Sequence, residues 1–448
     1  MYEFADEEID FTSTQSFVQP LKYCVQEHSY LNVIVKDKHT EKPFFERVSS
    51  INLEDHISII HDDAANDGSL ETLEKILPPI LDRPWPAGIP AWRVFILSLP
   101  SADGARKTSC FVAFAFSHTL GDGVSGLAFH RTLLDAWRND TAKDEKQSFL
   151  MTPSSRTLSA PFDTPERLPI SWKFLLGPLI AVYVPKFLGE LLGLRAAAST
   201  VDAGTWTGSH VFFEPKTDQT RVKLLEIEAP IVQKALQVSR NHDAKLTAVT
   251  HQLIIRALSR AIPDRNVTNF VSGTAIDMRG SIGIPGYTWG LFTSGYFAVY
   301  PRLPDVAGPV FSDEMWANAS SMTKKLSECA TTLQDQPIGL LRYAPSIREW
   351  TLGKIGQQRD CSYEVSNLLA FDGGSEQEKC KISKVVFTQP LNVPSAPLLF
   401  SIVSVKGGSL MCGVSWQAGA LGLSLEKEMP FVEEICSSFR AGFTALSD

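Results

Sequence analysis

Residues 109–123 carry the sequence SCFVAFAFSHTLGDG, an apolar run that ends in a polar turn containing glycine. The unbroken apolar character of residues 109–116 predicts a buried central strand, because a strand covered on both faces has no polar side. Beyond the turn, apolar residues recur at helical spacing and predict a helix over about 124–138: Leu127, Leu133, Leu134 and Trp137. Strand, turn and helix in this order indicate an α/β layered architecture.

Length and charge narrow the class of protein. The chain has 448 residues, of which 44% are hydrophobic and 21% are charged, as in an ordinary globular protein. One compact core cannot accommodate this length, so we expect roughly two to three domains, or two large halves that share one fold. Lys and Arg total 42 against 50 Asp and Glu, a net charge of −8. This balance argues against a nucleic-acid-binding protein, because phosphate binding needs clustered cations.

The cysteines and the first residues indicate the compartment. The seven cysteines are widely spaced and form no CxxC pair, which predicts neither a disulfide framework nor a structural zinc site: Cys24, Cys110, Cys329, Cys361, Cys380, Cys412 and Cys436. The chain opens with the acidic sequence MYEFADEEID, which lacks the apolar segment of a secretory signal. We therefore expect a reducing, cytoplasmic environment and no bound metal.

Both halves of the chain mix strand and helix patterns. Apolar runs bounded by turn residues predict further strands at 31–35, 92–99, 222–227, 268–275, 296–301, 382–388, 398–405 and 409–416. Pro230 suits the first position of a helix over 231–240. Thr247 is expected to cap a second helix, in which Val249 and Leu253 share an apolar face.

Residues 140–215 differ in composition from the rest. A polar stretch punctuated by prolines leads into the apolar segment 169–194, which Pro178, Pro185 and several charged residues interrupt. These interruptions argue against a membrane-spanning helix. We expect a crossover packed on the fold between the two halves; the alternative is a peripheral, interfacial membrane helix.

His118 is the most promising residue for chemistry. It follows the predicted strand directly, and a histidine at a strand end faces the crevice where a substrate could bind. An imidazole can accept a proton near neutral pH. Gly121 and Gly123 are expected to permit a sharp turn around Asp122. The pattern suits neither a metal site nor a G-x-S-x-G hydrolase, and by itself it supports a structural role as well as a catalytic one.

The segment FSHTLGDG, residues 116–123, resembles the H-x-x-x-D-G signature of the CoA-dependent acyltransferases. That superfamily includes plant BAHD acyltransferases, chloramphenicol acetyltransferase and condensation domains of nonribosomal peptide synthesis. The chain is most similar to the fungal alcohol O-acetyltransferases. Weaker similarities extend over most of the chain, at 44–48, 51–53, 246–248, 365–368, 407–410 and 414–417.

The resemblance implies an α/β fold of two chloramphenicol-acetyltransferase-like halves, each a mixed sheet with helices, and an active-site tunnel between them. We expect an N-terminal half over 1–160, a crossover over 161–215 and a C-terminal half over 216–448. His118 would act as the general base on the acceptor hydroxyl, with acetyl-CoA as co-substrate and no bound cofactor. No covalent acyl-enzyme is needed, because holding both substrates beside one base lowers the barrier.

The resemblance also assigns supporting roles. Asp122 would be structural, its carboxylate turned away from the substrate and paired bidentately with an arginine, for which Arg279 is the best local match. The alternative for Arg279 is a surface loop residue. Gly123 completes the motif. Asn367 would lie near the donor site or, alternatively, stabilise a turn through its amide.

Other features set limits on the resemblance. The D-F-G-W-G motif of the plant enzymes is missing, with only a partial match at 371–374, which favours the fungal branch. Little sequence precedes residues 21–24, so the family's opening helix is expected to be absent or replaced. His130 would pack in the fold or face solvent, and His251 would be structural. Phosphate-binding glycine motifs are missing, so the tunnel itself would hold CoA.

We therefore expect a monomeric O-acyltransferase that esterifies a small, hydrophobic acceptor such as a secondary metabolite. A second hypothesis keeps the fold and the base but changes the reaction to condensation or cyclisation of a carrier- or CoA-bound substrate. A third is a non-catalytic binding protein that retains the tunnel. An intact His118 and Asp122 speak against the third, because a binding protein has no physical need of a base at a strand end.

Overall fold

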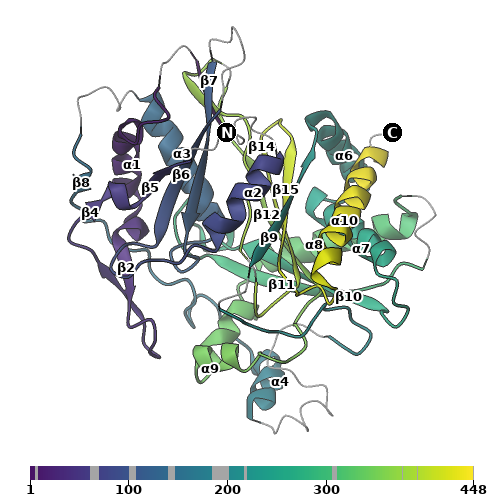
Figure 1. Cartoon of the computed structure of the whole chain (residues 1–448). Coiled ribbons are helices and arrows are strands. Elements are labelled where there is room, and N and C mark those ends of the chain that lie inside the picture. Colours follow the sequence, from purple (N-terminus) through teal and green to yellow (C-terminus); the bar gives the residue numbers. More distant parts are fainter. Residues whose placement is uncertain are drawn as a thin grey trace.

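The computed structural model describes residues 1–5, 9–60, 70–99, 107–139, 147–183, 201–215, 219–304, 310–375, 377–390 and 392–446. The described strands form two large sheets, each covered by helices, in an α/β arrangement (Figure 1). Two short strand pairs flank the first sheet: β2 (Val33–Lys36) with β3 (Phe44–Arg47), and β4 (Ile51–Asn52) with β8 (Leu150–Met151).

The first sheet has the order β13-β1-β7-β6-β5. Its strands are β13 (Cys380–Ile382), β1 (Tyr2–Ala5), β7 (Lys107–Phe116), β6 (Trp92–Leu99) and β5 (Ile57–Ile59). The expected central strand is therefore confirmed as β7. All neighbours are antiparallel except β5 and β6, which run parallel. Since β13 comes from late in the chain, the first sheet is completed by the second half of the sequence.

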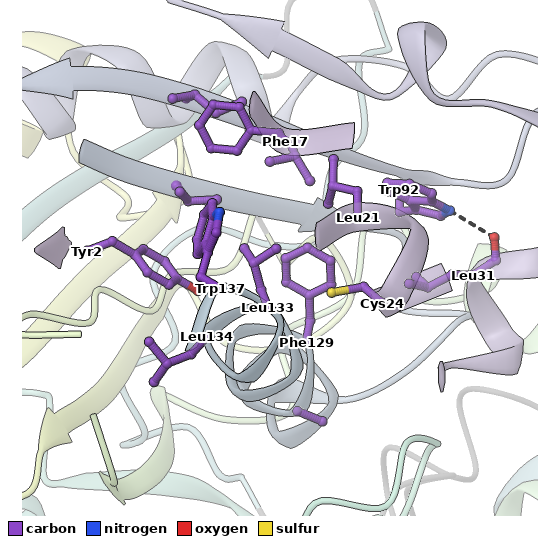
Figure 2. Packing of buried hydrophobic residues seen from close by; sticks show 14 of the residues in the cluster. Tyr2, Phe17, Leu21, Cys24, Leu31, Trp92, Phe129, Leu133, Leu134 and Trp137 are labelled. Carbon is purple, nitrogen blue, oxygen red and sulfur yellow. Dashed lines mark hydrogen bonds between the residues drawn. The ribbon is translucent and has the colours of Figure 1, made fainter. Parts of the chain in front are cut away.

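Two helices cover one face of this sheet, α1 (Gln15–Glu27) and α3 (Gly123–Arg138). Figure 2 shows side chains of α1 facing those of α3 in one buried cluster: Phe17, Leu21 and Cys24 against Phe129, Leu133 and Trp137. Trp92 lies at its edge and donates its indole N–H to the Leu31 carbonyl at 2.9 Å, so its one polar atom is satisfied. This core holds the N-terminal end of α3, and with it the H-x-x-x-D-G turn, against β7.

The second sheet has the order β11-β10-β12-β14-β15-β9. Its strands are β11 (Thr293–Pro301), β10 (Asn269–Asp277), β12 (Tyr363–Phe371), β14 (Leu398–Val405), β15 (Leu410–Gln417) and β9 (Thr220–Ile227). Strand β12 is parallel to both of its neighbours, and the other pairs are antiparallel. The helices α6 (Ala229–Asn241), α7 (Leu246–Ala261), α8 (Asp313–Thr331) and α10 (Leu425–Ala445) gather on one side of it (Figure 1).

Further segments join or flank the sheets. Helix α2 (Leu70–Leu81) packs on β9, where a Glu74 carboxylate oxygen accepts the Leu224 backbone N–H at 2.7 Å. The remaining elements are α4 (Trp172–Tyr183), α9 (Ile347–Leu352) and the 3-10 segments η1 (Ser29–Asn32), η2 (Leu53–Asp55), η3 (Gly280–Ile282) and η4 (Pro337–Tyr343). Within the described ranges, none of the helices is both long and apolar enough to cross a membrane.

Several sequence expectations need correction. The opening helix, expected to be absent or replaced, is present as α1, and its buried face includes Leu21 and Cys24. The strand expected at 382–388 ends at Ile382 as β13, and the following residues line the cavity without strand pairing. Thr247 lies inside α7, whose N-cap is Lys245. The strand expected at 31–35 is divided between η1 and β2.

The crossover is described only in part. Helix α4 packs through buried Leu175, while Trp172 is 75% exposed and Leu176 is 53% exposed. Residues 184–194 of the apolar segment lie outside the described residues.

Candidate active site

A cavity of about 680 Å³ lies between the two sheets. One wall comes from β7, the H-x-x-x-D-G turn and α3, and the opposite wall from β10, β11, β12 and residues 385–390. The latter half of β7 is only partly buried because its side chains line this cavity. The cavity explains why an apolar strand at the centre of the sheet is incompletely covered.

His118 lies directly after β7 and its side chain lines the cavity. It is an exposed residue, and within the described part of the chain its ring has no hydrogen-bond partner. An uncommitted imidazole that faces a cavity can exchange a proton with a bound molecule.

Asp122 is the N-cap of α3 and is 3% exposed. One carboxylate oxygen, Oδ1, accepts the Ser125 backbone N–H at 3.1 Å and the Arg279 Nη2 at 2.8 Å. The other, Oδ2, accepts the Phe292 backbone N–H at 3.0 Å and the Thr293 hydroxyl at 3.3 Å. Both oxygens are occupied by protein donors, so the structure supports no proton-transfer role for this carboxylate.

Arg279 is 1% exposed, which excludes the surface-loop alternative. The expected bidentate pairing with Asp122 is wrong in detail, because the guanidinium divides its donors among several partners. Nη2 bonds to Asp122, Nη1 donates to Asp277 Oδ1 at 2.8 Å, and Nε donates to the Thr288 carbonyl at 2.9 Å. The Phe292 ring lies 4.9 Å from the guanidinium carbon. Arg279 thus joins β10, the following loop and the motif turn.

The two glycines of the motif are required for close packing, because a side chain at either position would collide with neighbouring atoms. Their backbone angles are ordinary. Neither Gly121 nor Gly123 has a positive φ, so the turn around Asp122 does not depend on backbone angles that favour glycine. A Cβ on Gly123 would lie 2.7 Å from a Leu368 methyl group and 3.3 Å from the Phe387 ring. A Cβ on Gly121 would lie 2.7 Å from the Ser125 hydroxyl. Gly123 is needed because the second half of the chain approaches the motif closely, and Gly121 because the first turn of α3 folds back onto it.

Asn367 also lines the cavity, at an irregularity in β12 where the register with β14 shifts between residues 367 and 370. Its carbonyl oxygen accepts the backbone N–H of Leu369 at 2.8 Å, and Leu369 has φ of 62°. Its amide group donates to the Thr247 hydroxyl at 3.0 Å. The side chain therefore supports a local backbone turn and ties β12 to α7.

Sequence reasoning missed the segment 289–293, which surrounds the motif turn. The indole N–H of Trp289 donates to the Leu120 carbonyl at 2.7 Å. The Ser125 hydroxyl donates to the Gly290 carbonyl at 3.0 Å, and the Gly290 N–H donates back at 3.1 Å. The contacts join residues 165 or more positions apart, so no local pattern could have indicated them.

The other histidines in the interior have structural partners. His130 lines the cavity, but its Nδ1 lies 2.9 Å from the Tyr2 hydroxyl and burial lowers its pKa to about 3. His251 lies between the Tyr363 and Thr274 hydroxyls, at 3.1 and 3.2 Å, and burial likewise lowers its pKa to about 3. Among the described residues, no group of three or more histidine, cysteine or carboxylate side chains could hold a metal ion.

Solved structures with similar folds identify the architecture. The trichothecene 15-O-acetyltransferase TRI3 from Fusarium sporotrichioides matches with a TM-score of 0.65 over 99% of this chain and 89% of its own, at 11% identity. The condensation enzyme VibH matches with a TM-score of 0.52 over 98% of this chain and 89% of its own, at 12% identity. The fold is thus the two-lobed fold shared by acetyltransferases and condensation enzymes.

The chain belongs to the alcohol acetyltransferase family, whose model matches residues 15–443. It is similar to a probable alcohol acetyltransferase, FCK4, of Fusarium pseudograminearum, with 22% identity over 88% of this chain and 80% of the relative. A probable alcohol acetyltransferase of Aspergillus fumigatus, crmB, is 21% identical over 89% and 84%. The chain is therefore an O-acetyltransferase, and the family implies an acyl-CoA co-substrate.

Proposed function

We propose that the chain transfers the acetyl group of acetyl-CoA to a hydroxyl of a small, hydrophobic acceptor, with His118 as the general base. The observation that carries this proposal is the position of His118, exposed at the end of β7 in a cavity that both sheets line. Two substrates held in one cavity beside one base react as if within a single molecule, which removes much of the entropic barrier.

The proposed reaction needs only one titrating side chain. The acceptor oxygen attacks the acetyl carbonyl carbon of the thioester while the His118 imidazole takes the hydroxyl proton. The tetrahedral intermediate then collapses, its carbon–sulfur bond breaks, and the CoA thiolate takes the proton from the imidazolium. The products are an acetyl ester and free CoA, and the imidazole returns to its neutral form.

The cavity lining supports a hydrophobic acceptor. Its walls include Leu77, Ile80, Leu81, Val112, Phe114 and Phe297, and among its described lining residues there is neither lysine nor arginine. An anionic acceptor would lack a counter-charge there, whereas an apolar body would bury surface against these side chains. The CoA phosphates would accordingly lie outside the part of the cavity lined by these residues.

The remaining assignments are part of the same proposal. We assign the N-terminal half to 1–160, the crossover to 161–215 and the C-terminal half to 216–448, with a monomer in the cytoplasm as the working form. Asp122, Gly123 and Arg279 would position His118, and Asn367 would shape the wall opposite. Contact of 169–194 with a membrane surface is the less favoured alternative, supported among the described residues by exposed Trp172, Leu176 and Ile180 on α4.

Thiol release from acetyl-CoA in the presence of hydroxylated acceptors tests the proposal. We expect acceptor-dependent release by the wild type and a loss of about 10²- to 10⁴-fold in His118→Ala, the usual contribution of a general base. His39→Ala, at an exposed position, is the matched control and should retain wild-type rates. Retention of activity within about tenfold in folded His118→Ala would argue against a base at this position.

A further inference from the structure

Glu364 places a carboxyl group in the cavity. It is the second residue of β12 and lines the cavity, and its Cγ lies beside Gly273, which also lines the cavity. The alternate residues Tyr363 and Val365 are buried in the core of the second sheet, as strand geometry requires. Leu368, further along β12, contacts the motif turn at Gly123. Leu368 lies four residues after Glu364 along the strand, on the order of 13 Å away at about 3.3 Å per residue.

Hydrogen bonds hold the Glu364 carboxylate in one orientation and leave one of its acceptor positions unused. The Ser395 hydroxyl donates to Oε1, and the Cys361 thiol lies 3.8 Å from the same oxygen. The amide of Asn392 donates to Oε2 at 3.1 Å. A carboxylate has about four acceptor positions, so three donors leave one open. Burial raises the pKa of this carboxyl group, which increases the share of the form that can also donate.

The neighbouring strand makes room for this side chain. Gly273 of β10 pairs with Glu364 across the parallel ladder. A Cβ at position 273 would lie 2.9 Å from the Glu364 Cγ, closer than carbon atoms tolerate. The glycine thus lets the glutamate stem lie over β10 on the cavity side of the sheet.

The charges around the cavity limit what Glu364 can bind. Its described lining residues include three acidic residues, Asp122, Asp277 and Glu364, and no lysine or arginine. The guanidinium bonded to Asp122 and Asp277 is that of Arg279, which is not itself among the described lining residues. Anionic groups would be repelled, whereas a neutral hydroxyl can donate to the open acceptor position. The apolar walls between Glu364 and the motif turn suit an apolar body between two polar ends.

We infer that Glu364 binds a second hydroxyl of the acceptor. The acceptors are then neutral molecules that carry one hydroxyl at His118 and another at the opposite end of an apolar body. This inference rests on the proposed function and specifies its substrate class. Glu364 acts as a specificity-determining residue, because it selects the acceptor without contacting the reacting atoms. A site built to bond a hydroxyl discriminates strongly against the analogue that lacks it, since its polar group would remain unpaired.

Equilibrium binding provides the first test. The probes are linear α,ω-diols and the 1-alkanols of the same length, from hexyl to decyl chains, titrated calorimetrically into His118→Ala protein so that turnover does not interfere. At the best-fitting length we expect the diol to bind about tenfold to hundredfold more tightly than the alkanol. Glu364→Met should reduce this affinity ratio to about one, and Glu364→Gln should retain part of the preference for the diol. Glu434→Gln, at an exposed position on α10, should leave the ratio unchanged.

Turnover with the wild-type base separates this inference from the proposed function. In that background, Glu364→Met should raise the KM for diols while leaving the kcat and the KM for acetyl-CoA unchanged. Equal binding of diols and alkanols at every length would overturn the inference, even if both are acetylated. A rise in the KM for acetyl-CoA alone would overturn it by placing Glu364 in the donor site. A Glu364-dependent diol preference without any thiol release would support the inference and refute the proposed function.

Discussion

Asp122 and Arg279 form a buried joint between the two halves of the chain. The guanidinium and carboxylate belong to residues 157 positions apart, and their side chains are 1% and 4% exposed. A charge buried this deeply is tolerated only when its partners satisfy it, and here backbone and hydroxyl donors complete the set. The joint holds the turn that carries His118 at a defined place in the cavity.

Loss of the Asp122 charge is expected to destabilise the protein far more than loss of the other aspartate on Arg279. Asp122→Asn leaves a buried guanidinium without its main counter-charge, which should lower the free energy of unfolding by about 3–5 kcal/mol. Asp277→Asn is the matched control, because that side chain is 46% exposed and such a pair contributes less than about 1 kcal/mol. Denaturant unfolding measures both, and equal losses would contradict the joint described above.

At the scale of elements, the irregularity in β12 shapes the wall opposite His118. Asn367 holds the backbone N–H of Leu369, whose φ of 62° is unfavourable for a residue with a side chain. The intervening Leu368 is thereby directed at Gly123. A regular strand would not direct its side chains in this way, so the turn on the second sheet and the glycine on the first are complementary.

A pair of substitutions separates the two roles considered for Asn367. Asn367→Ala should lower the melting temperature, because it removes the acceptor for the Leu369 N–H. Adding Leu369→Gly should recover most of the lost melting temperature, since glycine adopts positive φ without strain and Leu369 is 65% exposed. Thermal denaturation and thiol release are measured together. A raised KM for acetyl-CoA that persists in the stable double variant would show instead that Asn367 contacts the donor.

The elements that the sequence predicted are those whose residue pattern is complete within a short stretch of chain. β7, α3 and β9 were recognisable because their periodicity is complete within a few residues. Strand β12 escaped notice because its turn and its polar cavity-facing residues interrupt the apolar pattern. Helix α1 contains Pro20, a residue that normally argues against a helix. Its buried face nevertheless packs on α3.

At the scale of the molecule, contacts between the halves are extensive. β13 pairs with β1 at the edge of the first sheet, and Arg138 of α3 donates to the carbonyls of Cys380 and Gly373. On the other side, Asp82 after α2 accepts the Thr220 backbone N–H of β9 at 2.9 Å. The cavity walls are therefore held at a fixed separation by both sheets.

Buried histidines are expected to make the whole molecule sensitive to acid. Burial lowers the pKa values of four of them, to about 4 for His28 and His56 and to about 3 for His130 and His251. The unfolded chain binds protons at these residues below about pH 6.5 and the folded protein does not. Their stabilising contribution is therefore complete above about pH 6.5 and is lost as the pH falls toward 4, by up to about 1.4 kcal/mol per pH unit for each histidine.

Thermal unfolding between about pH 7.5 and pH 5 measures this effect, above the range where most carboxylates titrate. The melting temperature should fall with pH in the wild type and fall less steeply in His251→Gln. His39→Gln, at an exposed position, should follow the wild type. A melting temperature that does not change over this interval would contradict the burial of neutral histidines.

Local sequence patterns were sufficient for the α/β class, for the strand–turn–helix around His118 and for the candidate base, because these depend on neighbours within a few positions. The family resemblance added Asp122, Gly123, Arg279 and Asn367 as supporting residues. The folded arrangement was needed to divide the Arg279 donors among their partners, to show that Gly123 is small because Leu368 approaches it, and to bring Glu364 into the cavity. These features depend on the register of two sheets and on contacts between distant segments, which no local pattern in the chain encodes.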